Sequence, residues 1–274
     1  MSEQPDDLQL VLSLGDLAEE ITLGSWRSSD LPTRSKSDGS PVTPVDIEVE
    51  RRLRERVLGM YPDDGFVSEE LGTTVGTSGR CWYVDGIDGT TAYAGGRTEW
   101  STLIALTDSR GLRQGLCTGP ALGKRWYTDA NGRAVTTGPS GQASYVRVAA
   151  APREPDARVA CWPPAQRIAG LLSGHTQSRL EELTAGRATR PSWGAGVPNA
   201  AMLVAEGRLD GFVLIGGGPW DHAAAAAIVV GAGGAWSALS GDQDLHTPAI
   251  VLTNGSIHEW LLGQLESEDD ARRE

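Results

Sequence analysis

Four acidic clusters in the sequence carry side chains that could hold divalent cations. They are Asp46 in VTPVD, the pair Glu69–Glu70 in VSEELG, Asp85 and Asp88 in VDGIDGTT, and Asp221 in GPWDHAAA. Carboxylates that converge in one cleft repel one another unless cations lie among them. A ligand set made of oxygen atoms alone favours Mg²⁺ over Zn²⁺. If the fold brings these clusters together, the sequence predicts a magnesium site.

The strongest single signal is the segment from residue 81 to residue 91. An apolar strand over 81–84 delivers Asp85 at its end, and Asp88 follows one turn further on. Two carboxylates at this spacing can share one hard cation or bridge two. Gly89 and Thr90 open a tight turn whose amides are free, and such amides receive phosphate groups as helix N-termini do. The segment therefore predicts cation and phosphate binding at one point.

Each cluster alone also has a simpler interpretation. Asp-Gly pairs are mostly plain turns. Glu69 and Glu70 would fit the solvated end of a helix, and Asp46 and Asp221 would fit helix N-caps. Only the combination of the four clusters favours chemistry over local structure.

Composition and charge restrict the class of protein. The 274 residues suffice for one large or two smaller domains, and the hydrophobic fraction of 39% is ordinary for a soluble globular protein. The net charge of −12 argues against a nucleic-acid partner. It leaves a phosphorylated small molecule possible, because bound cations make an acidic site attractive to phosphate. The three cysteines form no CxxC pair, so neither zinc nor disulfides are expected.

Nothing in the sequence suggests a membrane or an export signal. No apolar run approaches the ~20 residues that a membrane helix needs. The start, MSEQPDDLQ, lacks the basic residues and apolar core of a signal peptide. We therefore expect a cytoplasmic protein with no membrane partner.

Hydrophobic periodicity predicts the elements that must position the acidic residues in the first half of the chain. Helices are expected over 8–23 and 45–60, the second with Thr43 and Asp46 at its start. The polar stretch between them is expected to form an ordered loop or hairpin. Short strands, mostly antiparallel, are expected over 65–67, 81–84, 100–107, 115–118 and 125–128.

The second half changes to strands that alternate with helices, which predicts an α/β layer. Strands are expected over 158–162, 209–215 and 249–253, and helices over 166–172, 177–184, 198–207, 221–231 and 257–265. We expect residues 1–150 to form an α+β half with an antiparallel sheet and most metal ligands. Residues 151–266 would form an α/β half that supplies Asp221 and the substrate pocket, and 267–274 a charged tail. The boundary between the two halves (the seam) is expected near 149–157.

Taken in order, the four clusters resemble the inositol-monophosphatase family. The matching blocks are D-G-S-P-V-T-x-x-D, E-E, W-x-x-D-x-I-D-G-T-T and W-D-x-A-A, and the resemblance covers about residues 8–265. It implies an α+β / α/β fold, the layered αβαβα sandwich of the inositol-monophosphatase and fructose-1,6-bisphosphatase type. It also implies a Mg²⁺-dependent phosphomonoesterase that acts on a small phosphorylated metabolite and forms a homodimer.

The resemblance implies which acidic residues bind metal. Glu69, Asp85 and the carbonyl oxygen of Ile87 would bind a first ion, which polarises the attacking water and makes Glu69 part of the catalytic set. Asp85, Asp88 and Asp221 would bind a second ion, which neutralises the leaving-group oxygen. A third, weaker ion near Glu69 would bring the number to two or three Mg²⁺.

Further roles follow from the same resemblance. Thr90, supported by Asp46, would orient and help to deprotonate the water, and the amides of Gly89 and Thr90 would hold the phosphate. Glu70 would reach a metal through water. Lys36 could add positive charge near the site, although a plain surface lysine is the preferred interpretation.

Some positions depart from the family pattern. Gly86 stands where the family usually has proline, which predicts looser metal geometry with no ligand lost. Segments 96–106 and 119–137 resemble the histidinol-phosphate phosphatase branch. However, Leu214 stands where family members carry glutamate, Gly218 stands where the branch tends to have lysine, and the branch's aspartate is missing at 196–197.

The lost glutamate would remove a polar anchor worth about 1–3 kcal/mol if it is buried. A bulkier or less polar leaving group, such as a nucleoside or a cyclitol-type intermediate, would fit such a pocket. Leu214 and Gly218 are therefore candidate specificity residues, and Arg97 and Trp193 join them, each with an ordinary surface or packing role as the alternative.

Three functions stay open from the sequence. The favoured one is a phosphatase for a nucleoside, cyclitol or amino-alcohol phosphate. The second is a true histidinol-phosphate phosphatase or an inositol monophosphatase. The third is a metal-dependent binding or regulatory homologue without turnover. The intact Thr90–Asp46 pair argues against this last function, because a binding module has no need to activate water.

Overall fold

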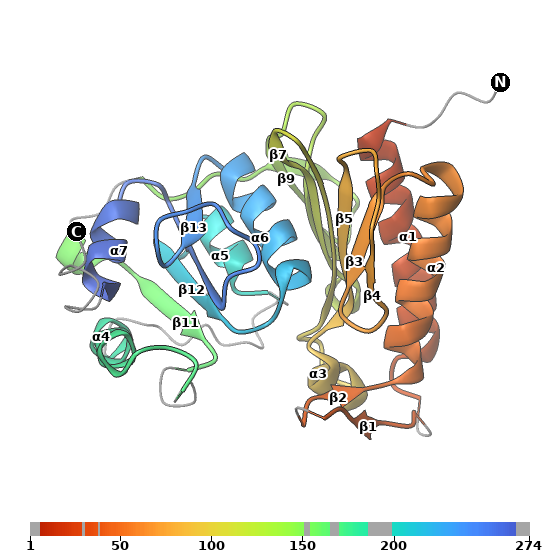
Figure 1. Cartoon of the computed structure of the whole chain (residues 1–274), viewed down its shortest axis with the longest axis horizontal. Helices are drawn as coiled ribbons and strands as arrows, with labels where there is room; N and C mark the ends of the chain where they lie inside the picture. Colours follow the sequence, from red (N-terminus) through yellow and green to blue (C-terminus); the bar gives the residue numbers. More distant parts are fainter. Residues whose placement is uncertain are drawn as a thin grey trace.

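The computed structural model of the chain describes residues 6–28, 31–37, 39–150, 154–164, 170–185 and 199–266. The described elements stack in five layers, in the order helices, sheet, helices, sheet, helices (Figure 1). The predicted αβαβα sandwich is confirmed. Within the described residues no helix is long and apolar enough to cross a membrane.

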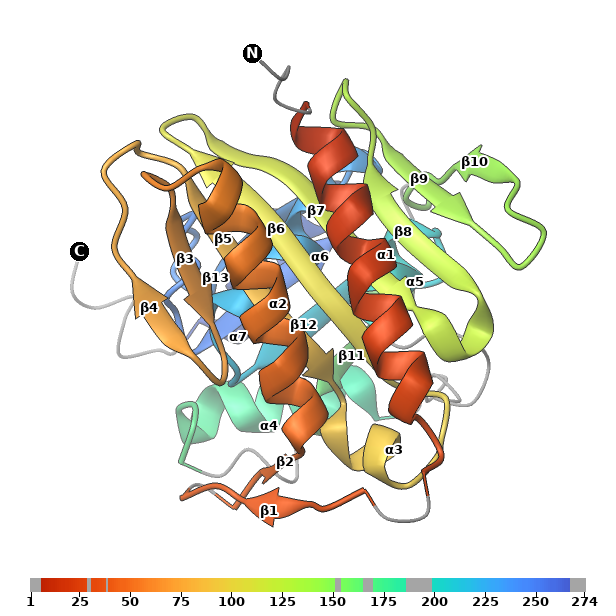
Figure 2. The same cartoon turned by 90° about the vertical axis from the view of Figure 1, so that its right-hand side faces the viewer.

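The first layer consists of α1 (Asp7–Ser25) and α2 (Pro44–Met60), close to the predicted bounds. Thr43 begins α2 as predicted, since its Oγ1 accepts from the amide of Val45 and its own amide donates to Asp46. Both helices lie on the outer face of the larger sheet (Figure 2). Their buried side chains, among them Leu10, Leu14, Val49 and Leu53, pack there against Trp82, Ile104 and Leu116. This packing holds Asp46 beside the sheet.

The larger sheet has eight strands in the order β10-β9-β8-β7-β6-β5-β3-β4. Neighbouring strands pair antiparallel except β3 and β5, which are parallel. The bounds are β3 Gly65–Ser68, β4 Gly72–Thr74, β5 Cys81–Asp88, β6 Ser101–Asp108, β7 Gly111–Gly119, β8 Lys124–Thr128, β9 Ala134–Thr137 and β10 Ala143–Tyr145. The short strands β4, β9 and β10 were not predicted, because their pairing partners supply order that their own residues do not signal.

Two smaller elements complete this half. The polar stretch before α2, predicted as an ordered loop or a hairpin, contains a hairpin formed by β1 (Arg34–Ser35) and β2 (Pro41–Val42). The short helix α3 (Thr90–Ala94) follows β5 directly. Both lie at the end of the large sheet where β5 ends (Figure 1).

The second sheet has four strands in the order β11-β12-β14-β13. Only β11 and β12 are parallel. Helices α5 and α6 separate this sheet from the larger one, and α4 and α7 cover its outer face (Figure 1). The bounds are α4 Gly174–Thr184, α5 Ala201–Ala205, α6 Pro219–Gly231, α7 His258–Leu265, β11 Val159–Trp162, β12 Gly211–Ile215, β13 Ala235–Ala238 and β14 Ala249–Thr253.

Three expectations for this half need correction. The helix expected over 198–207 is the shorter α5, because Arg208 and Leu209 donate their amides to the carbonyl of Leu203 and close the turn. Residues 170–172 of the helix expected over 166–172 are not helical, and 166–169 lie outside the described residues. The strand β13 was missed, since a four-residue run between glycine pairs and a turn carries little periodicity.

The alanine-rich helix α6 packs against both sheets. Its buried small side chains allow close approach, and a Cβ on Gly115 of β7 would lie 2.7 Å from the Cβ of Ala227. The chain passes from one sheet to the other between Tyr145 and Val159, the interval that contains the expected seam. The division into two halves remains a prediction.

Candidate active site

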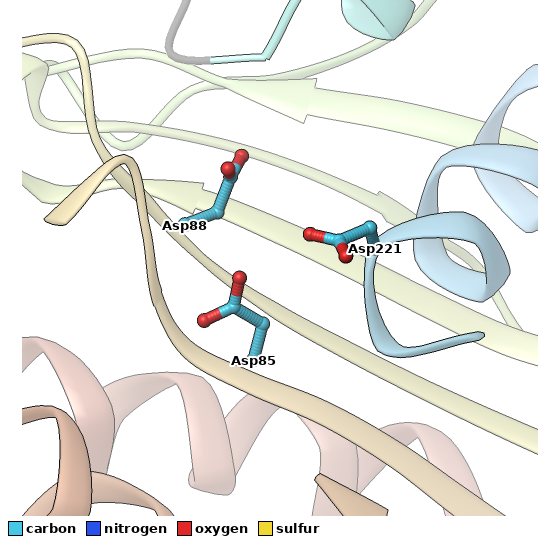
Figure 3. A group of neighbouring side chains, drawn as sticks. All are labelled: Asp85, Asp88 and Asp221. Carbon is cyan, nitrogen blue, oxygen red and sulfur yellow. The ribbon is translucent and has the colours of Figure 1, made fainter. Parts of the chain in front are cut away.

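Three aspartates from distant parts of the chain meet where β5 ends and α6 begins. Carboxylate oxygens of Asp85, Asp88 and Asp221 all lie within 4.8 Å of one another. Figure 3 shows Asp85 and Asp88 on β5 and Asp221 on the first turn of α6, with the three side chains next to one another. They line a cavity of about 460 Å³, which Glu69 and Thr90 also line. The fold thus brings three of the predicted clusters into one site.

The strand β5 was expected to end before Asp85. It runs on to Asp88 instead. Along a regular strand, residues three apart point to opposite faces. The pairing with β6 shifts between Asp85 and Asp88, which marks a β-bulge. The amide of Ile87 donates to Asp85 Oδ1 at 2.9 Å inside this bulge. The irregularity therefore lets both carboxylates face the cavity.

Asp221 occupies the first turn of α6, and its Oδ2 accepts from the amide of Gly218 at 2.7 Å. The carboxylate there gains from the positive end of the helix dipole. Gly217 has a φ of +72°, and a Cβ on it would lie 2.3 Å from Asp221 Oδ2. Glycine at this position leaves room for the carboxylate to turn into the cavity. Asp221 can thus cap α6 and bind a metal ion at the same time.

Thr90 and Asp46 form the expected pair. Thr90 Oγ1 lies 2.8 Å from Asp46 Oδ1, to which it donates, and 3.0 Å from the carbonyl oxygen of Ile87. Asp46 Oδ2 accepts from the amide and the hydroxyl of Thr43, at 3.0 and 2.5 Å. Burial raises the pKa of Asp46, while its hydrogen bonds with Thr43 and Thr90 oppose that rise. The Thr90 hydroxyl is therefore fixed by a buried carboxylate.

The turn between Asp88 and Thr90 depends on Gly89. Its φ of +88° lies in the left-handed region, which favours glycine. A Cβ at this position would lie 2.7 Å from the carbonyl oxygen of Glu99. The backbone at Gly89 consequently passes close to residues 99–100, which lead into β6, and residues 89 and 90 both line the cavity.

Lys36 is not the plain surface lysine that was expected. Its Nζ donates to Glu69 Oε1 at 2.5 Å and to Glu70 Oε1 at 2.8 Å, and only 22% of its side chain is exposed. Burial alone would lower the pKa of Lys36, but the bonds to both glutamates raise it above its ordinary value. The β1–β2 hairpin carries Lys36 there, and Glu69 lies in the β3–β4 turn rather than at a helix end.

The electrostatics of the aspartate cluster fit a cation. Asp85 is 2% exposed, and no amide or hydroxyl of the described residues donates to its Oδ2. Burial and the charges of Glu69, Asp221 and Asp88 raise its pKa well above the usual range. Burial and the charge of Asp88 do the same to Asp221. Positive charge placed among these oxygens would relieve both costs, and an oxygen-only set suits Mg²⁺.

These raised pKa values predict how the metal-free protein responds to pH. When a carboxyl group has a higher pKa in the folded than in the unfolded state, its contribution to the free energy of unfolding is fully present below the unfolded pKa, about 3.9 for aspartate. That contribution is lost as pH rises through the raised folded value. With a chelator present, wild type should therefore lose free energy of unfolding relative to Asp85→Asn as the pH rises above about 3.9 and through the raised folded pKa of Asp85.

Urea unfolding of both proteins at each pH measures this difference. His222 and His258, whose pKa values are lowered by burial, contribute equally to both proteins and cancel in the comparison. Saturating Mg²⁺ should reverse the trend for wild type. A pH-independent difference between wild type and the variant would contradict the assignment of an uncompensated charge to Asp85.

The sequence relatives agree with this geometry. Residues 11–270 match the sequence model of the inositol monophosphatase family. The chain belongs to that family. It is 32% identical over 274 residues to a histidinol-phosphatase of Streptomyces coelicolor, a match that covers 97% of this chain and 98% of the relative. It is 34% identical over 265 residues to a histidinol-phosphatase of Mycobacterium tuberculosis, covering 96% and 98%.

A solved inositol monophosphatase from Zymomonas mobilis has the same fold, with a TM-score of 0.74 at 23% identity over 97% of this chain and 100% of that one. The predicted family and the likeness to the histidinol-phosphate phosphatase branch are confirmed. The chain is therefore a phosphoric monoester hydrolase of the inositol monophosphatase family. Members of this family are in general Mg²⁺-dependent and act on small phosphorylated substrates.

Two site residues of this family member were missed by sequence reasoning. Ser101 Oγ and Asn199 Nδ2 donate to Asp88 Oδ2 at 3.1 and 3.2 Å. Asn199 Oδ1 accepts from the amide of Ala201 at 3.0 Å, which fixes the amide with Nδ2 toward Asp88. Both donors occupy the same oxygen and hold the carboxylate in place. No local sequence signal marks either residue, because only the tertiary fold brings them to Asp88.

The second sheet contributes apolar side chains to the cavity lining. Leu214 lines it together with Phe212 on β12, and Trp162 of β11 pairs with Leu214 across the parallel ladder. Trp162 was also missed, although it ends a predicted strand, the place where α/β sheets put ligand contacts. Arg97 lines the cavity as well.

Of the other candidate specificity positions, only Gly218 belongs to the part of the chain that the structure describes. Among the described residues that line the cavity Gly217 is present and Gly218 is not. A Cβ on Gly218 would lie 2.5 Å from the ring of Trp220, so a side chain at this position would meet that ring. Trp193 and residues 196–197 lie outside the described residues.

Proposed function

We propose that this phosphatase uses Mg²⁺ and an activated water to release phosphate from a small metabolite with a bulky or weakly polar leaving group. The observation that supports it most is the meeting of Asp85, Asp88 and Asp221 beside the hydrogen-bonded pair Thr90–Asp46 at one cavity. Carboxylates in a non-catalytic metal site would not require a hydroxyl held by a buried acid at the same place.

The residues are assigned to two ions, with a third near Glu69 as a further possibility. Glu69, Asp85 and the carbonyl of Ile87 would hold one ion, and Asp85, Asp88 and Asp221 the other. Ions in such a pair lower the pKa of a bound water and neutralise charge on the leaving oxygen. Glu70, bonded to Lys36 here, would take part only through water.

The chain's own groups would position the reactants. The Thr90 hydroxyl donates a hydrogen bond to Asp46. The lone pairs of Thr90 Oγ1 can therefore accept a hydrogen bond from a water in the cavity. Asp46, with its pKa raised by burial, can take up a proton more readily than an exposed aspartate. The amides of Gly89 and Thr90 would bind phosphate oxygens.

The apolar part of the cavity lining supports the choice of leaving group. Leu214 replaces a charged anchor with an aliphatic side chain, and Phe212 and Trp162 extend the same surface. Nucleoside and cyclitol-type phosphates are the preferred classes, and histidinol phosphate is expected to be a poor substrate. The histidinol-phosphatase relatives favour the competing assignment. Location in the cytoplasm and a homodimeric state complete the proposal.

Substitution of Leu214 tests the substrate assignment. Leu214→Glu should improve kcat/KM for small polyhydroxylated or amino-alcohol phosphates about 10-fold, the equivalent of about 1.4 kcal/mol of recovered binding. The gain is expected to be partial, because the branch's aspartate is also missing at 196–197. Leu214→Met, which keeps the size and polarity class, is the matched control and should leave the preference unchanged.

The assay is phosphate release with Mg²⁺ from histidinol phosphate, inositol phosphates and nucleoside monophosphates. The wild-type protein should prefer the bulkier substrates over histidinol phosphate. A wild-type kcat/KM for histidinol phosphate above that of every nucleotide and cyclitol phosphate would overturn the substrate assignment and establish the competing one.

A further inference from the structure

Beneath the active site lies a carboxylate that takes no part in the reaction described above. Glu50 of α2 is 0% exposed, and it is not among the described residues that line the cavity. No ion pair joins it to a described lysine or arginine. Because a buried carboxylate without a cation is costly, its contacts to neighbouring groups must explain why it is there.

Those contacts go to the turn that carries Glu69. Glu50 Oε2 accepts from the amides of Glu70 and Leu71, at 2.9 and 3.1 Å. These amides directly follow Glu69 in the β3–β4 turn. One carboxylate oxygen thus holds two successive amides of the turn that the Ser68–Gly72 pair closes.

Glu50 also lies against the strand end that carries Asp85. A Cβ on Gly86 would be 3.1 Å from Glu50 Cγ and 2.9 Å from the carbonyl oxygen of Asp46. Glycine at position 86 therefore allows α2 to approach β5 closely. Close packing against α2 thus supports the strand end, and the looser metal geometry expected from the loss of the family's proline stays a prediction.

The same helix also carries Asp46, one turn before Glu50. Residues four apart lie on one helix face, so Asp46 and Glu50 both point toward the large sheet. Asp46 holds Thr90, and Glu50 holds the turn after Glu69. A single rigid helix, lying across the outer face of the sheet (Figure 2), thus sets the spacing between two parts of the active site.

We propose that Glu50 is a positioning residue that sets the place of Glu69 relative to Asp85 and Thr90 by binding the amides of residues 70 and 71. The proposal deepens the proposed function, since it gives Glu69 its place in the metal site. Burial raises the pKa of Glu50 to about 7, against the amides that favour its carboxylate. An acceptor oxygen faces the two amides in either protonation state, so the role does not depend on titration.

Two variants separate position from charge. Glu50→Gln keeps the length and an acceptor oxygen but loses the charge, and Glu50→Asp keeps the charge but withdraws the oxygens by one methylene. The Mg²⁺ concentration for half-maximal activity should rise about 10-fold or more in Glu50→Asp, in the range found for residues that support metal ligands. In Glu50→Gln it should stay within about 3-fold of wild type, and KM at saturating Mg²⁺ should change little in both.

A second readout does not require catalysis. Hydrogen exchange at the amides of residues 70 and 71 should accelerate in Glu50→Asp and stay near the wild-type rate in Glu50→Gln. Glu55→Gln, an exposed change on the same helix beside Arg51, is the control and should alter neither readout. If wild type shows no Mg²⁺-dependent hydrolysis, the proposed function fails, and exchange still decides the role of Glu50.

The opposite ranking of the two variants would overturn the proposal. If Glu50→Asp retains wild-type Mg²⁺ dependence and exchange while Glu50→Gln loses metal affinity, Glu50 acts through its charge on the metal site. Wild-type exchange at residues 70 and 71 in Glu50→Asp would contradict the positioning role by itself.

Discussion

Asp85→Asn should lower turnover by about 10³-fold or more at saturating substrate and Mg²⁺. Asp85 belongs to the carboxylate cluster and is assigned to both ions, so its loss removes electrostatic stabilisation worth several kcal/mol in the transition state. The variant should remain folded, because the change removes a buried charge that is uncompensated in the metal-free protein. Steady-state phosphate release and a thermal melt in chelator measure both effects.

The matched control for this prediction is Asp129→Asn. Asp129 caps the exposed β8–β9 turn, where it bonds Arg133, and it should affect turnover less than about 2-fold. Turnover of Asp85→Asn within 10-fold of wild type would contradict the assignment of Asp85 to both ions.

Thr90→Ala should lower kcat by about 10²- to 10⁴-fold, the usual range for lost proton-transfer assistance. The Thr90 hydroxyl contacts Asp46 and the carbonyl oxygen of Ile87 but no carboxylate of the aspartate cluster, so the Mg²⁺ concentration for half-maximal activity should change less than about 3-fold. Thr90→Ser, which keeps the hydroxyl, should retain most of the rate. Initial rates measured as a matrix of substrate and Mg²⁺ concentrations separate these constants.

The alternative role for Thr90 gives a different pattern. If Thr90 only contacts the phosphate, Thr90→Ala would raise KM and leave kcat unchanged. That result would remove the Thr90–Asp46 pair from the mechanism and favour a binding role for the site.

The sequence predicted the elements whose own residues carry a strong period or cap. Helix α2 is one example, since Thr43 and Asp46 mark its start and Val49 and Leu53 its buried face. The strand that delivers Asp85 was likewise evident from its apolar residues. The resemblance to the family also predicted that Asp221 lies beside the end of β5, a contact that hydrophobic periodicity alone does not specify.

Other features depend on contacts between distant segments and left no local signal. Lys36 looked like a surface lysine because its partners, Glu69 and Glu70, lie in another turn of the fold. The bulge that turns Asp88 to the side of Asp85 arises from the pairing of β5 with β6. Asn199 reaches Asp88 only because the two sheets pack around α5 and α6.

In the metal-free protein, the carboxylates required for the proposed function lower the free energy of unfolding. Burial raises the pKa values of Asp85, Asp88 and Asp221, and neighbouring carboxylates raise those of Asp85 and Asp221 further, which costs folding free energy unless a cation is present. Such a cost is typical of residues selected for chemistry rather than for packing. Mg²⁺ that binds the folded state alone should therefore raise the melting temperature.

Phosphate release from a nucleoside monophosphate, followed as Mg²⁺ is removed by a chelator and then restored, tests the central claim. Wild type should lose its activity on chelation and regain it with Mg²⁺, while Asp85→Asn should stay inactive throughout. Hydrolysis by wild type that survives exhaustive chelation would contradict the metal-dependent mechanism.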